Sequence, residues 1–487
     1  MRYLLGIDQG TTQTTAVVID EDGQLVASRV AQVPVVFPQP GWVEQDPWDV
    51  LRTVRETAEP LVQAYPIEAF GFANQGETFV LWDAESGEPL TPAIVWQDKR
   101  GVSVCERLAP RVDTEWLRRT TGLLLDSYFS APKLRHVLEA RPVLAQAAKQ
   151  GRVRFGTTES WVLWHLSRGR LHITDPSTAS RTLLYNIGSL SWDAQLLALF
   201  DVDPRMLPEV RPSGGLAGEI ELGGKRLPLH ALLVDQQAAL FGQACFEPGD
   251  MKCSFGTGSF LLMNIGAEPR LSQHGLLTTV AWQIDGQASY ALDGGVFVAG
   301  AAVQWLAESL RLLPNVAASE RMANASTDPG VVVVPALAGL AAPHWKPDVR
   351  GAIFGLSRAT TPEDLVRATL EGIACRVTEV VRAMELDSGR AVSALRVDGG
   401  PSANAYLMQA LADLTGLEVR VAAVREATAM GVAALAAHSV WGVGLSELSA
   451  RWRAESVYAP RIADPERQTR LDRWRRALAA AQLFHHD

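Results

Sequence analysis

Two stretches of this chain share the same design, a strand, a short turn of glycine and threonine, and a second strand. The first is YLLGIDQGTTQTTAVVID near the amino terminus, and the second is MKCSFGTGSFLLMNIG, halfway along the 487 residues. Runs rich in β-branched residues around a Gly/Thr turn predict a β-hairpin with a polar tip. With the two turns aligned, Ser254 stands where Asp8 stands, so only the first copy carries an acid. The repetition predicts a duplicated α/β chain whose two copies differ in chemistry.

The length of the chain supports two domains, because 487 residues exceed what one hydrophobic core usually organises. The composition, 47% hydrophobic and 20% charged, is that of a globular protein. Pro248 and Gly249 indicate a linker between the two copies. We therefore expect a first domain over residues 1–245, a second over 246–438, and a helical tail over 439–487 that packs on the second domain.

Charge and spacing exclude several kinds of partner. A formal charge of −9 offers no basic surface for a nucleic acid. The longest apolar stretch, residues 331–342, is interrupted by proline and glycine and falls short of the roughly 20 residues of a spanning helix, so no membrane partner is expected. Four cysteines without a CxxC pair indicate neither a zinc site nor a disulfide framework. Because the first apolar run is also too short for a signal peptide, we expect a cytoplasmic protein.

Glycine-rich turns are candidates for binding the phosphates of a nucleotide, because backbone amides approach phosphate oxygens where no Cβ intervenes. Besides the two hairpin turns, the chain offers Asp398-Gly399-Gly400 after the predicted strand ALRVD. Each of these alone is better explained as a tight turn, and it is their combination that favours a nucleotide site. No GxxxxGK[ST] sequence occurs, so a Walker-type phosphate loop is excluded.

Asp235 stands between a short apolar strand, residues 229–234, and the predicted helix QQAALFGQ. An aspartate in that position can cap the helix, or it can serve as a general base at the end of the strand. Spacing alone leaves both interpretations open. Farther along, the run EDLVRATLEGIACRVTEVVRAMEL after Pro362 has apolar residues at three and four spacing and predicts a long amphipathic helix.

The segment GAIFGLSRATTPEDLVRATLE, residues 351–371, resembles the second signature of the FGGY carbohydrate kinases throughout its length. The first signature region, YFSAPKLRH, matches more loosely, since a tryptophan usual in that family is His136 here. Stretches such as PGWVEQDP, TGLLLDSYFS, DQQAALFGQ and VFVAGAAVQWL are most similar to the glycerol kinases of the family. The resemblance implies two actin-like (ribonuclease H-like) ATPase domains with a cleft between them. It also implies the use of ATP and Mg²⁺ to phosphorylate a hydroxyl of a small polyol or sugar, and assembly as a homodimer or homotetramer.

The same resemblance implies roles for individual residues. Asp235 matches the general base of the family, and Asp8 and Asp235 match the acids around Mg²⁺. Contacts to the polyol or sugar are implied for Gly76, Glu77, Trp96, Tyr128, Asp235 and Gln236. Contacts to the nucleotide are implied for Thr11, Thr12, Thr257, Gly300, Gln304, Gly400 and Asn404.

One departure from the family pattern affects the expected substrate. Glycerol kinases typically read NQRET where this chain reads NQGET, so Gly76 replaces an arginine that hydrogen-bonds glycerol. A hydrogen bond from a charged donor contributes roughly 1.5–3 kcal/mol, or about one to two orders of magnitude in affinity. Loss of the long side chain is also expected to enlarge the pocket. The alternative is therefore a kinase for a xylulose- or ribulose-type pentulose or for a polyol of four or five carbons.

A more remote alternative is a non-catalytic or filament-forming ATPase, because actin-like proteins use the same hairpins. The polar set Glu77, Tyr128, Asp235 and Gln236 argues against it, since a purely structural ATPase needs no polyol pocket.

Overall fold

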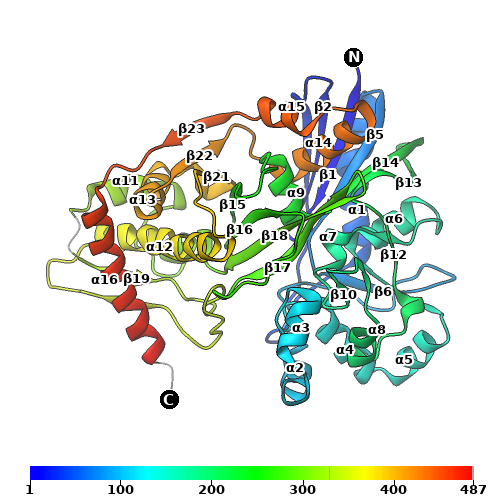
Figure 1. Ribbon diagram of the computed structural model, residues 1–487, viewed down its shortest axis with the longest axis horizontal. Helices are drawn as coiled ribbons and strands as arrows, with labels where there is room; N and C mark the ends of the chain where they lie inside the picture. Colours follow the sequence, from blue (N-terminus) through cyan, green and yellow to red (C-terminus); the bar gives the residue numbers. More distant parts are fainter. Residues whose placement is uncertain (328–329, 485–487) are drawn as a thin grey trace.

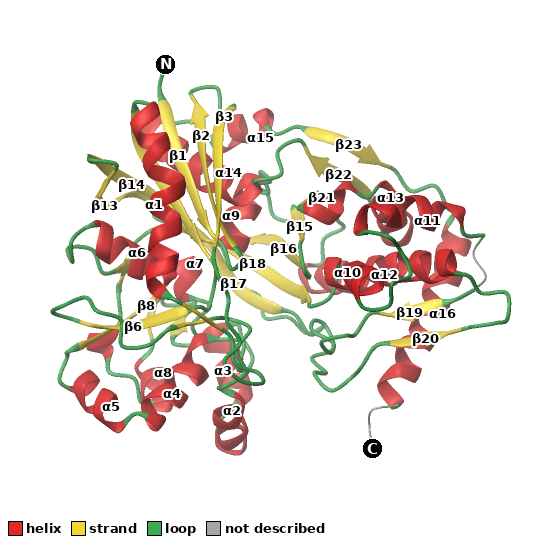
Figure 2. Ribbon diagram, turned by 180° about the vertical axis from the view of Figure 1, so that it is seen from behind, coloured by secondary structure: helices red, strands yellow, loops and turns green. Residues whose placement is uncertain are grey.

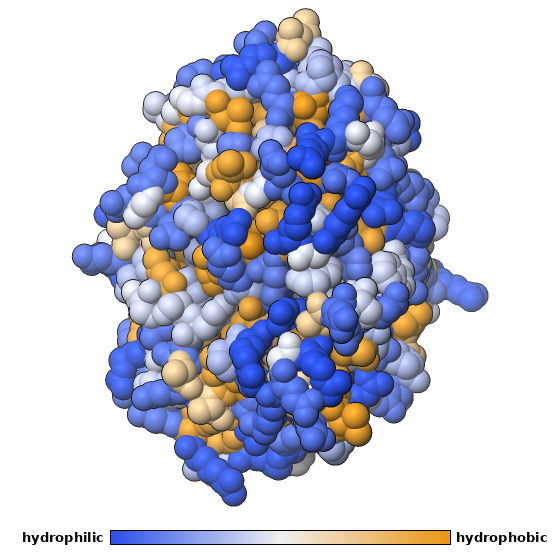
Figure 3. Space-filling model, turned by 90° about the vertical axis from the view of Figure 1, so that its right-hand side faces the viewer, coloured by the Kyte–Doolittle hydropathy of each residue, from blue (hydrophilic) through white to orange (hydrophobic). Residues whose placement is uncertain are grey.

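The computed structural model describes residues 1–327 and 330–484 of the chain. Two large sheets, each covered by helices, form two lobes that lie side by side (Figures 1 and 2). The α/β architecture with two sheet-based domains is thus the one expected from the duplicated hairpins. Within the described residues, none of the helices combines the length and the hydropathy needed to cross a lipid bilayer. The face of the first lobe in Figure 3 is mostly hydrophilic, with hydrophobic residues in small separate patches.

The first sheet contains six strands in the order β13-β14-β5-β1-β2-β3. These are β1 (Tyr3–Gln9), β2 (Gln13–Asp20), β3 (Leu25–Gln32), β5 (Ile67–Asn74), β13 (Gly214–Leu222) and β14 (Lys225–Val234). β1 and β2 form the predicted hairpin, and β5 runs parallel to both β1 and β14. Asn74 is in register with Gln9 on one side and with Val234 on the other. The carboxyl ends of three parallel strands therefore meet at one edge, where ligands commonly bind in open α/β sheets.

The second sheet contains seven strands in the order β17-β18-β16-β15-β21-β22-β23. These are β15 (Met251–Phe255), β16 (Ser259–Gly266), β17 (Leu277–Ile284), β18 (Gln287–Val296), β21 (Ala394–Asp398), β22 (Glu418–Ala422) and β23 (Ala454–Tyr458). β15 and β16 form the second predicted hairpin, and β15, β21 and β22 are parallel. Ser254 pairs with Asp398, so this sheet also has an acid at the edge where its parallel strands end.

The described residues form α-helices, several of which cover the faces of the two sheets (Figure 2). They are α1 (Pro47–Ala64), α2 (Val102–Leu108), α3 (Thr114–Thr121), α4 (Ser130–Ala140), α5 (Pro142–Lys149), α6 (Thr158–Leu166), α7 (Pro176–Ala179), α8 (Ala194–Phe200), α9 (Asp235–Gly242), α10 (Gly300–Glu308), α11 (Ser319–Ala325), α12 (Pro362–Ser388), α13 (Ala405–Thr415), α14 (Ala427–Trp441), α15 (Leu445–Arg451) and α16 (Asp464–Leu483). The long amphipathic helix predicted after Pro362 is α12, which begins with a capping box at Thr361 and Asp364. Its apolar face is part of the core of the second lobe.

A separate helical layer lies below the first sheet in Figure 1 and is built from residues between β5 and β13. A four-stranded sheet of β4 (Glu44–Gln45), β7 (Ala93–Ile94), β6 (Phe79–Asp83) and β8 (Val153–Thr157) joins it to the rest of the lobe. Phe79, Phe129, Phe155 and Phe200 are buried in its own hydrophobic core. This layer carries Tyr128 in the loop before α4. Tyr128 lines a cavity between the two lobes, which is described below.

Helix α14 packs on the first sheet. The domain boundaries expected from the sequence assign most of this helix to the second domain. A Cβ on Gly6 of β1 would lie 2.1 Å from the carbonyl oxygen of Ala429, and one on Gly71 of β5 would lie 2.2 Å from that of Val432. Only glycine permits such a close approach of helix and strands. The two lobes are therefore joined through a shared core that includes α14, β1 and β16.

The residues after α14 contain a strand as well as helices, which differs from the wholly helical tail expected from the sequence. β23 pairs antiparallel with β22 and extends the second sheet at its edge. Its residues alternate between half-buried and exposed, a pattern too short to be recognised in the sequence. α16 then packs on the second lobe by burying Leu471, Trp474 and Leu478.

Candidate active site

A cavity of about 550 Å³ lies between the lobes, where the parallel strands of the first sheet end. The hairpin turn of the first lobe lies on one side of it, and that of the second lobe lies on another. Ten of the residues implicated by sequence line this cavity, namely Asp8, Thr11, Thr12, Gly76, Glu77, Trp96, Tyr128, Asp235, Gln236 and Thr257. The fold thus brings together residues that are separated by up to about half of the chain.

Asp8 and Asp235 are the two carboxylates at the centre of this cavity. Burial, followed by the neighbouring charge of Asp235, raises the pKa of Asp8 to about 8. Burial also raises the pKa of Asp235, to about 6, although the Gln236 N–H and the cations Lys252 and Arg181 oppose that rise. The buried Oδ1 of Asp8 has no hydrogen-bond partner among the described residues. Asp8 is thus a carboxylate that is costly to ionise beside a second acid, a cost that a bound cation would relieve.

Asp8 and Asp235 fit the ligand set that is expected for Mg²⁺. Mg²⁺ is usually held by one or two carboxylates, with water and substrate phosphates as the remaining ligands. No group of three or more potential metal-binding side chains occurs within the described residues, so a site made wholly of protein ligands is not formed there. The orphaned oxygen of Asp8, next to Asp235, fits the partial ligand set of Mg²⁺.

Glu77 is held by a buried ion-pair network. The Nε of Arg181 donates to Glu77 Oε1 at 2.7 Å, and Nη1 of Arg181 lies 2.9 Å from Asp293 Oδ2. Burial raises the pKa of Glu77 to about 7, against the opposing effect of Arg181. Glu77 also has a φ of 60°, a left-handed conformation that costs free energy for a non-glycine residue and clusters at functional sites. The ion pairs hold Oε1 of Glu77 in place, and Glu77 lines the cavity.

Trp96 and Tyr128 form an aromatic wall of the cavity. Their rings meet edge to face, with centroids 5.6 Å apart. The Nε1 of Trp96 donates to Thr11 Oγ1 at 2.9 Å, which links this wall to the first hairpin turn. Behind the wall, the buried Nζ of Lys133 donates to the backbone carbonyls of Trp96 and Tyr128, and burial lowers the pKa of this lysine to about 7. Trp82, in contrast, is fully buried in the core.

The second lobe reaches Gln236 through Lys252. The Nζ of Lys252, the second residue of β15, donates to Gln236 Oε1 and to Ser254 Oγ, and its side chain is fully buried. Burial lowers the pKa of Lys252, whereas Asp398 and Asp235 oppose that effect. The contact joins the two lobes directly beneath the cavity.

Gly76 lies against Val234, the last residue of β14. A Cβ added at Gly76 would lie 2.9 Å from Val234 Cγ2, shorter than real Cβ contacts. Val234 therefore fills the space next to Gly76, and the enlarged pocket expected from the loss of an arginine is not found at this position.

The residues implicated in nucleotide binding divide into two sets. Thr11, Thr12 and Thr257 line the cavity, whereas Gly300, Gln304, Gly400 and Asn404 lie outside it, on the second lobe. Gly300 begins α10 and donates its N–H to the Gly256 carbonyl, and a Cβ on Gly300 would lie 2.5 Å from that oxygen. Gln304 bonds Glu308 on the surface of α10. Asn404 caps α13 and also donates to Ser319 Oγ.

Sequence reasoning missed four charged residues of the site. Arg181 and Asp293 complete the network around Glu77, Lys252 holds Gln236, and Lys133 supports the aromatic wall. The available signal was indirect, because Lys252 stands within the second Gly/Thr hairpin, MKCSFGTGSFLLMNIG, and Lys133 stands within the signature region YFSAPKLRH. A charged residue within an apolar strand such as β15 is itself a sign of a buried partner.

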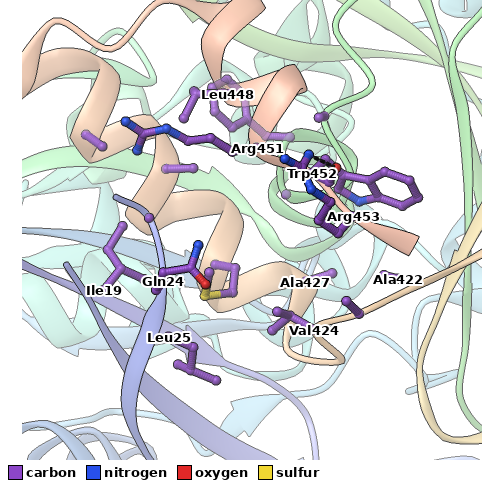
Figure 4. Close-up of a pocket in the computed structure, with 18 of the residues that line it drawn as sticks. Ile19, Gln24, Leu25, Ala422, Val424, Ala427, Leu448, Arg451, Trp452 and Arg453 are labelled. Atoms are coloured by element: carbon purple, nitrogen blue, oxygen red, sulfur yellow. Dashed lines mark hydrogen bonds between the residues drawn. The ribbon is translucent and has the colours of Figure 1, made fainter. Parts of the chain in front are cut away.

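A second cavity, of about 200 Å³, lies away from the carboxylates, where α14 and α15 meet the turn between β2 and β3 (Figure 4). Its walls are mostly aliphatic, and Arg451, Trp452 and Arg453 stand along one side. No acidic side chain occurs among the described residues that line it. Because its described lining has no carboxylate, the larger cavity is the candidate active site.

Comparison with known proteins agrees with this geometry. Residues 3–242 match the model of the N-terminal domain of the FGGY family of carbohydrate kinases, and residues 251–440 match that of its C-terminal domain. A glycerol kinase of Halorhodospira halophila is 46% identical over 98% of this chain and 96% of its own length.

Solved structures extend the comparison. The glycerol kinase of Plasmodium falciparum, solved with ADP, superposes with a TM-score of 0.92 at 31% identity, over 99% of this chain and 98% of that one. A xylulose kinase of Lactobacillus acidophilus has a TM-score of 0.87 but only 20% identity, over 99% of both chains, which shows a common fold alone. Both halves of the sequence, the whole of the fold and the carboxylates at the strand ends lead to one assignment: the chain belongs to the FGGY family of carbohydrate kinases.

Proposed function

We propose that this protein transfers the γ-phosphoryl group of ATP to a hydroxyl of glycerol or of a polyol of similar size, with Asp235 as the general base. The observation that carries the proposal is the convergence of Asp8, Glu77 and Asp235 at the ends of three parallel strands, opposite the Gly/Thr turn of the second lobe. ATP-dependent phosphorylation of a polyol follows from the family and from its glycerol kinase relatives. The assignment of Asp235 and of the other site residues is our own.

In this mechanism Asp235 accepts the proton of the attacking hydroxyl. The hydroxyl oxygen forms a bond to the γ-phosphorus, the bond from that phosphorus to the β,γ-bridging oxygen breaks, and ADP leaves with the electron pair. Because burial brings the pKa of Asp235 to about 6, this carboxyl is mostly ionised at neutral pH and can act as a base. Mg²⁺, held by Asp8 and Asp235 together with the phosphates, would neutralise charge that develops on the transferred group.

The remaining site residues bind and orient the two substrates. We assign Glu77, Tyr128 and Gln236 to the hydroxyls of the polyol, and Trp96 to the wall that packs on its carbon chain. Thr11, Thr12 and Thr257 would donate to phosphate oxygens. Gly300, Gln304, Gly400 and Asn404 would face the nucleoside, at the same end of the second sheet as Thr257.

The pentulose alternative rested on the space expected beside Gly76. Val234 occupies that space, and the xylulose kinase of Lactobacillus acidophilus, at 20% identity, shares less sequence with this chain than the glycerol kinase of Halorhodospira halophila, at 46%. The polyol assignment is therefore favoured over the pentulose assignment. A non-catalytic actin-like ATPase has no use for the Glu77–Arg181–Asp293 network around the cavity.

The test is an assay of ADP release with glycerol, erythritol, the pentitols, xylulose and ribulose. We expect the highest kcat/KM for glycerol. A clear preference for xylulose or ribulose would contradict the proposal, as would ATP hydrolysis that none of these compounds stimulates.

Three further properties complete the proposal. The division into residues 1–245, 246–438 and 439–487 is testable by limited proteolysis within residues 243–250, which neither family model covers. A homodimer or homotetramer would appear in sedimentation as two or four times the chain mass of 52.8 kDa. A cytoplasmic location accords with four cysteines that are free thiols.

A further inference from the structure

One wall of the polyol cavity consists of a single contact between two residues. Val234 ends β14 in register with Asn74 of β5, so its side chain reaches the backbone of the turn that follows β5. There it covers Gly76, where an added Cβ would lie 2.9 Å from Val234 Cγ2. Val234 is 2% exposed, and both residues line the cavity.

Glycine is required at position 76 because of the Val234 methyl group and not because of the backbone conformation. The φ angle of Gly76 lies outside the left-handed region, so the conformation is accessible to any residue. The next nearest atom to an added Cβ is Arg181 Cγ, at an ordinary contact distance of 3.9 Å. The position of Val234 alone therefore determines how much room this wall leaves.

Another part of the cavity lining is polar. Glu77 and Tyr128 line the same cavity, and Arg181 forms ion pairs with both Glu77 and Asp293 there. A polyol fits such a cavity with its hydroxyls toward the polar groups and its C–H bonds against the valine methyls. A β-branched side chain is restricted at χ1, so the methyl groups of Val234 hold a fixed position in this lining.

We propose that Val234, seated over Gly76, is the residue that restricts this kinase to polyols of three carbons. The inference rests on the proposed function and deepens it by naming the group that selects the substrate. An apolar pocket discriminates against one additional carbon by roughly 10- to 200-fold. Erythritol, which adds one CHOH unit to glycerol, is the matched probe.

The first experiment measures kcat/KM for glycerol and erythritol in the wild type, Val234→Ala and Val234→Thr. Removal of both methyls in Val234→Ala is expected to raise the ratio of erythritol to glycerol by roughly 10- to 200-fold. Val234→Thr is the control for the β-branched shape, because threonine keeps the branch at Cβ while a hydroxyl replaces one methyl, and it should keep the ratio within about threefold of the wild type. An unchanged ratio in Val234→Ala would overturn the inference.

The second experiment tests the contact itself. Gly76→Ala should lower kcat/KM for glycerol by about tenfold in the presence of Val234, because the added methyl must displace Cγ2. In the Val234→Ala background the same change should have little effect, both on kcat/KM and on the melting temperature. Equal losses in the two backgrounds would refute the contact as the reason for glycine at position 76.

The two proposals fail in different ways. If the wild type uses glycerol but the ratio and the coupling do not respond to Val234, only the selective role of Val234 is wrong. If the wild type phosphorylates erythritol as well as glycerol, the size limit is wrong while the kinase assignment stands. If no polyol stimulates ADP release by any variant, the proposed function is wrong and the inference falls with it.

Discussion

The ion-pair network around Arg181 offers the strongest test of how this site is held together. Arg181 contacts Glu77 and Asp293, and the side chains of the three residues are only 5%, 5% and 10% exposed. Arg181→Met keeps much of the side-chain volume but removes the charge. Two carboxylates then remain buried without their cation, which is far more costly than the loss of a surface ion pair.

The magnitude follows from this burial. Removing one partner of a buried pair costs about 3–5 kcal/mol. Each kcal/mol shifts the melting temperature of a unit of 150–250 residues by roughly 2–4 °C, so we expect a loss of roughly 6–20 °C for the first lobe. Because the folded-state pKa of Glu77 is already raised to about 7 and would rise further without Arg181, the loss should grow as pH increases through that pKa and shrink in acid.

The assay combines thermal unfolding at about pH 5.5 and 8.5 with steady-state kinetics for glycerol. Arg100→Met is the matched control, since Arg100 is 4% exposed and paired with Asp98 and Glu44 outside the cavity. Both variants should lose stability, but only Arg181→Met should raise KM for glycerol, because Glu77 loses its support. A fall in melting temperature of less than about 2 °C for Arg181→Met, or equal changes of KM in the two variants, would refute this reasoning.

Three other predictions follow from the site and its surroundings. Asp235→Asn should lower kcat by about 10²- to 10⁴-fold while the affinity for ADP changes little, and near-normal turnover would remove Asp235 from the mechanism. Chelation with EDTA should abolish turnover until Mg²⁺ is restored, and Asp8→Asn should raise the Mg²⁺ concentration for half-maximal rate about tenfold or more; full activity without a divalent cation would contradict the magnesium site. Burial raises the pKa of Glu159 from 4.5 to about 7, so its stabilising contribution is present below the unfolded value and is lost as pH rises through 7. The melting temperature should therefore fall more between about pH 5 and 8.5 in the wild type than in Glu159→Gln, and parallel curves would show that Glu159 is not responsible.

Local patterns were sufficient to predict the elements that position the chemistry. Both Gly/Thr hairpins, the strand that ends at Asp235 and helix α12 are where periodicity and turn residues placed them. Such features depend on residues a few positions apart, and their energetics are set by backbone conformation and by one apolar face. The family resemblance lies in these same stretches, so family and fold could be inferred before any tertiary contact was known.

Contacts between distant segments were beyond this kind of reasoning. Arg181 and Glu77 are separated by 104 positions, and no local pattern indicates that they form an ion pair. The placement of α14 on the first sheet depends on glycines in β1 and β5 that sequence alone presents as ordinary strand residues. β23 forms a strand by pairing with β22 at the edge of the second sheet, and its own sequence does not indicate that contact.

The contact between Gly76 and Val234 shows which properties of the site the sequence determines and which depend on the tertiary structure. By itself, the sequence determined that an acid follows the strand over residues 229–234 and that a glycine stands beside Glu77. A missing side chain was therefore expected to leave space. Only the tertiary structure decided that the neighbouring strand fills that space with a valine, because the register between β5 and β14 sets which side chain faces the turn. Side-chain identity is local, whereas the volume of a cavity is a property of all the elements that surround it.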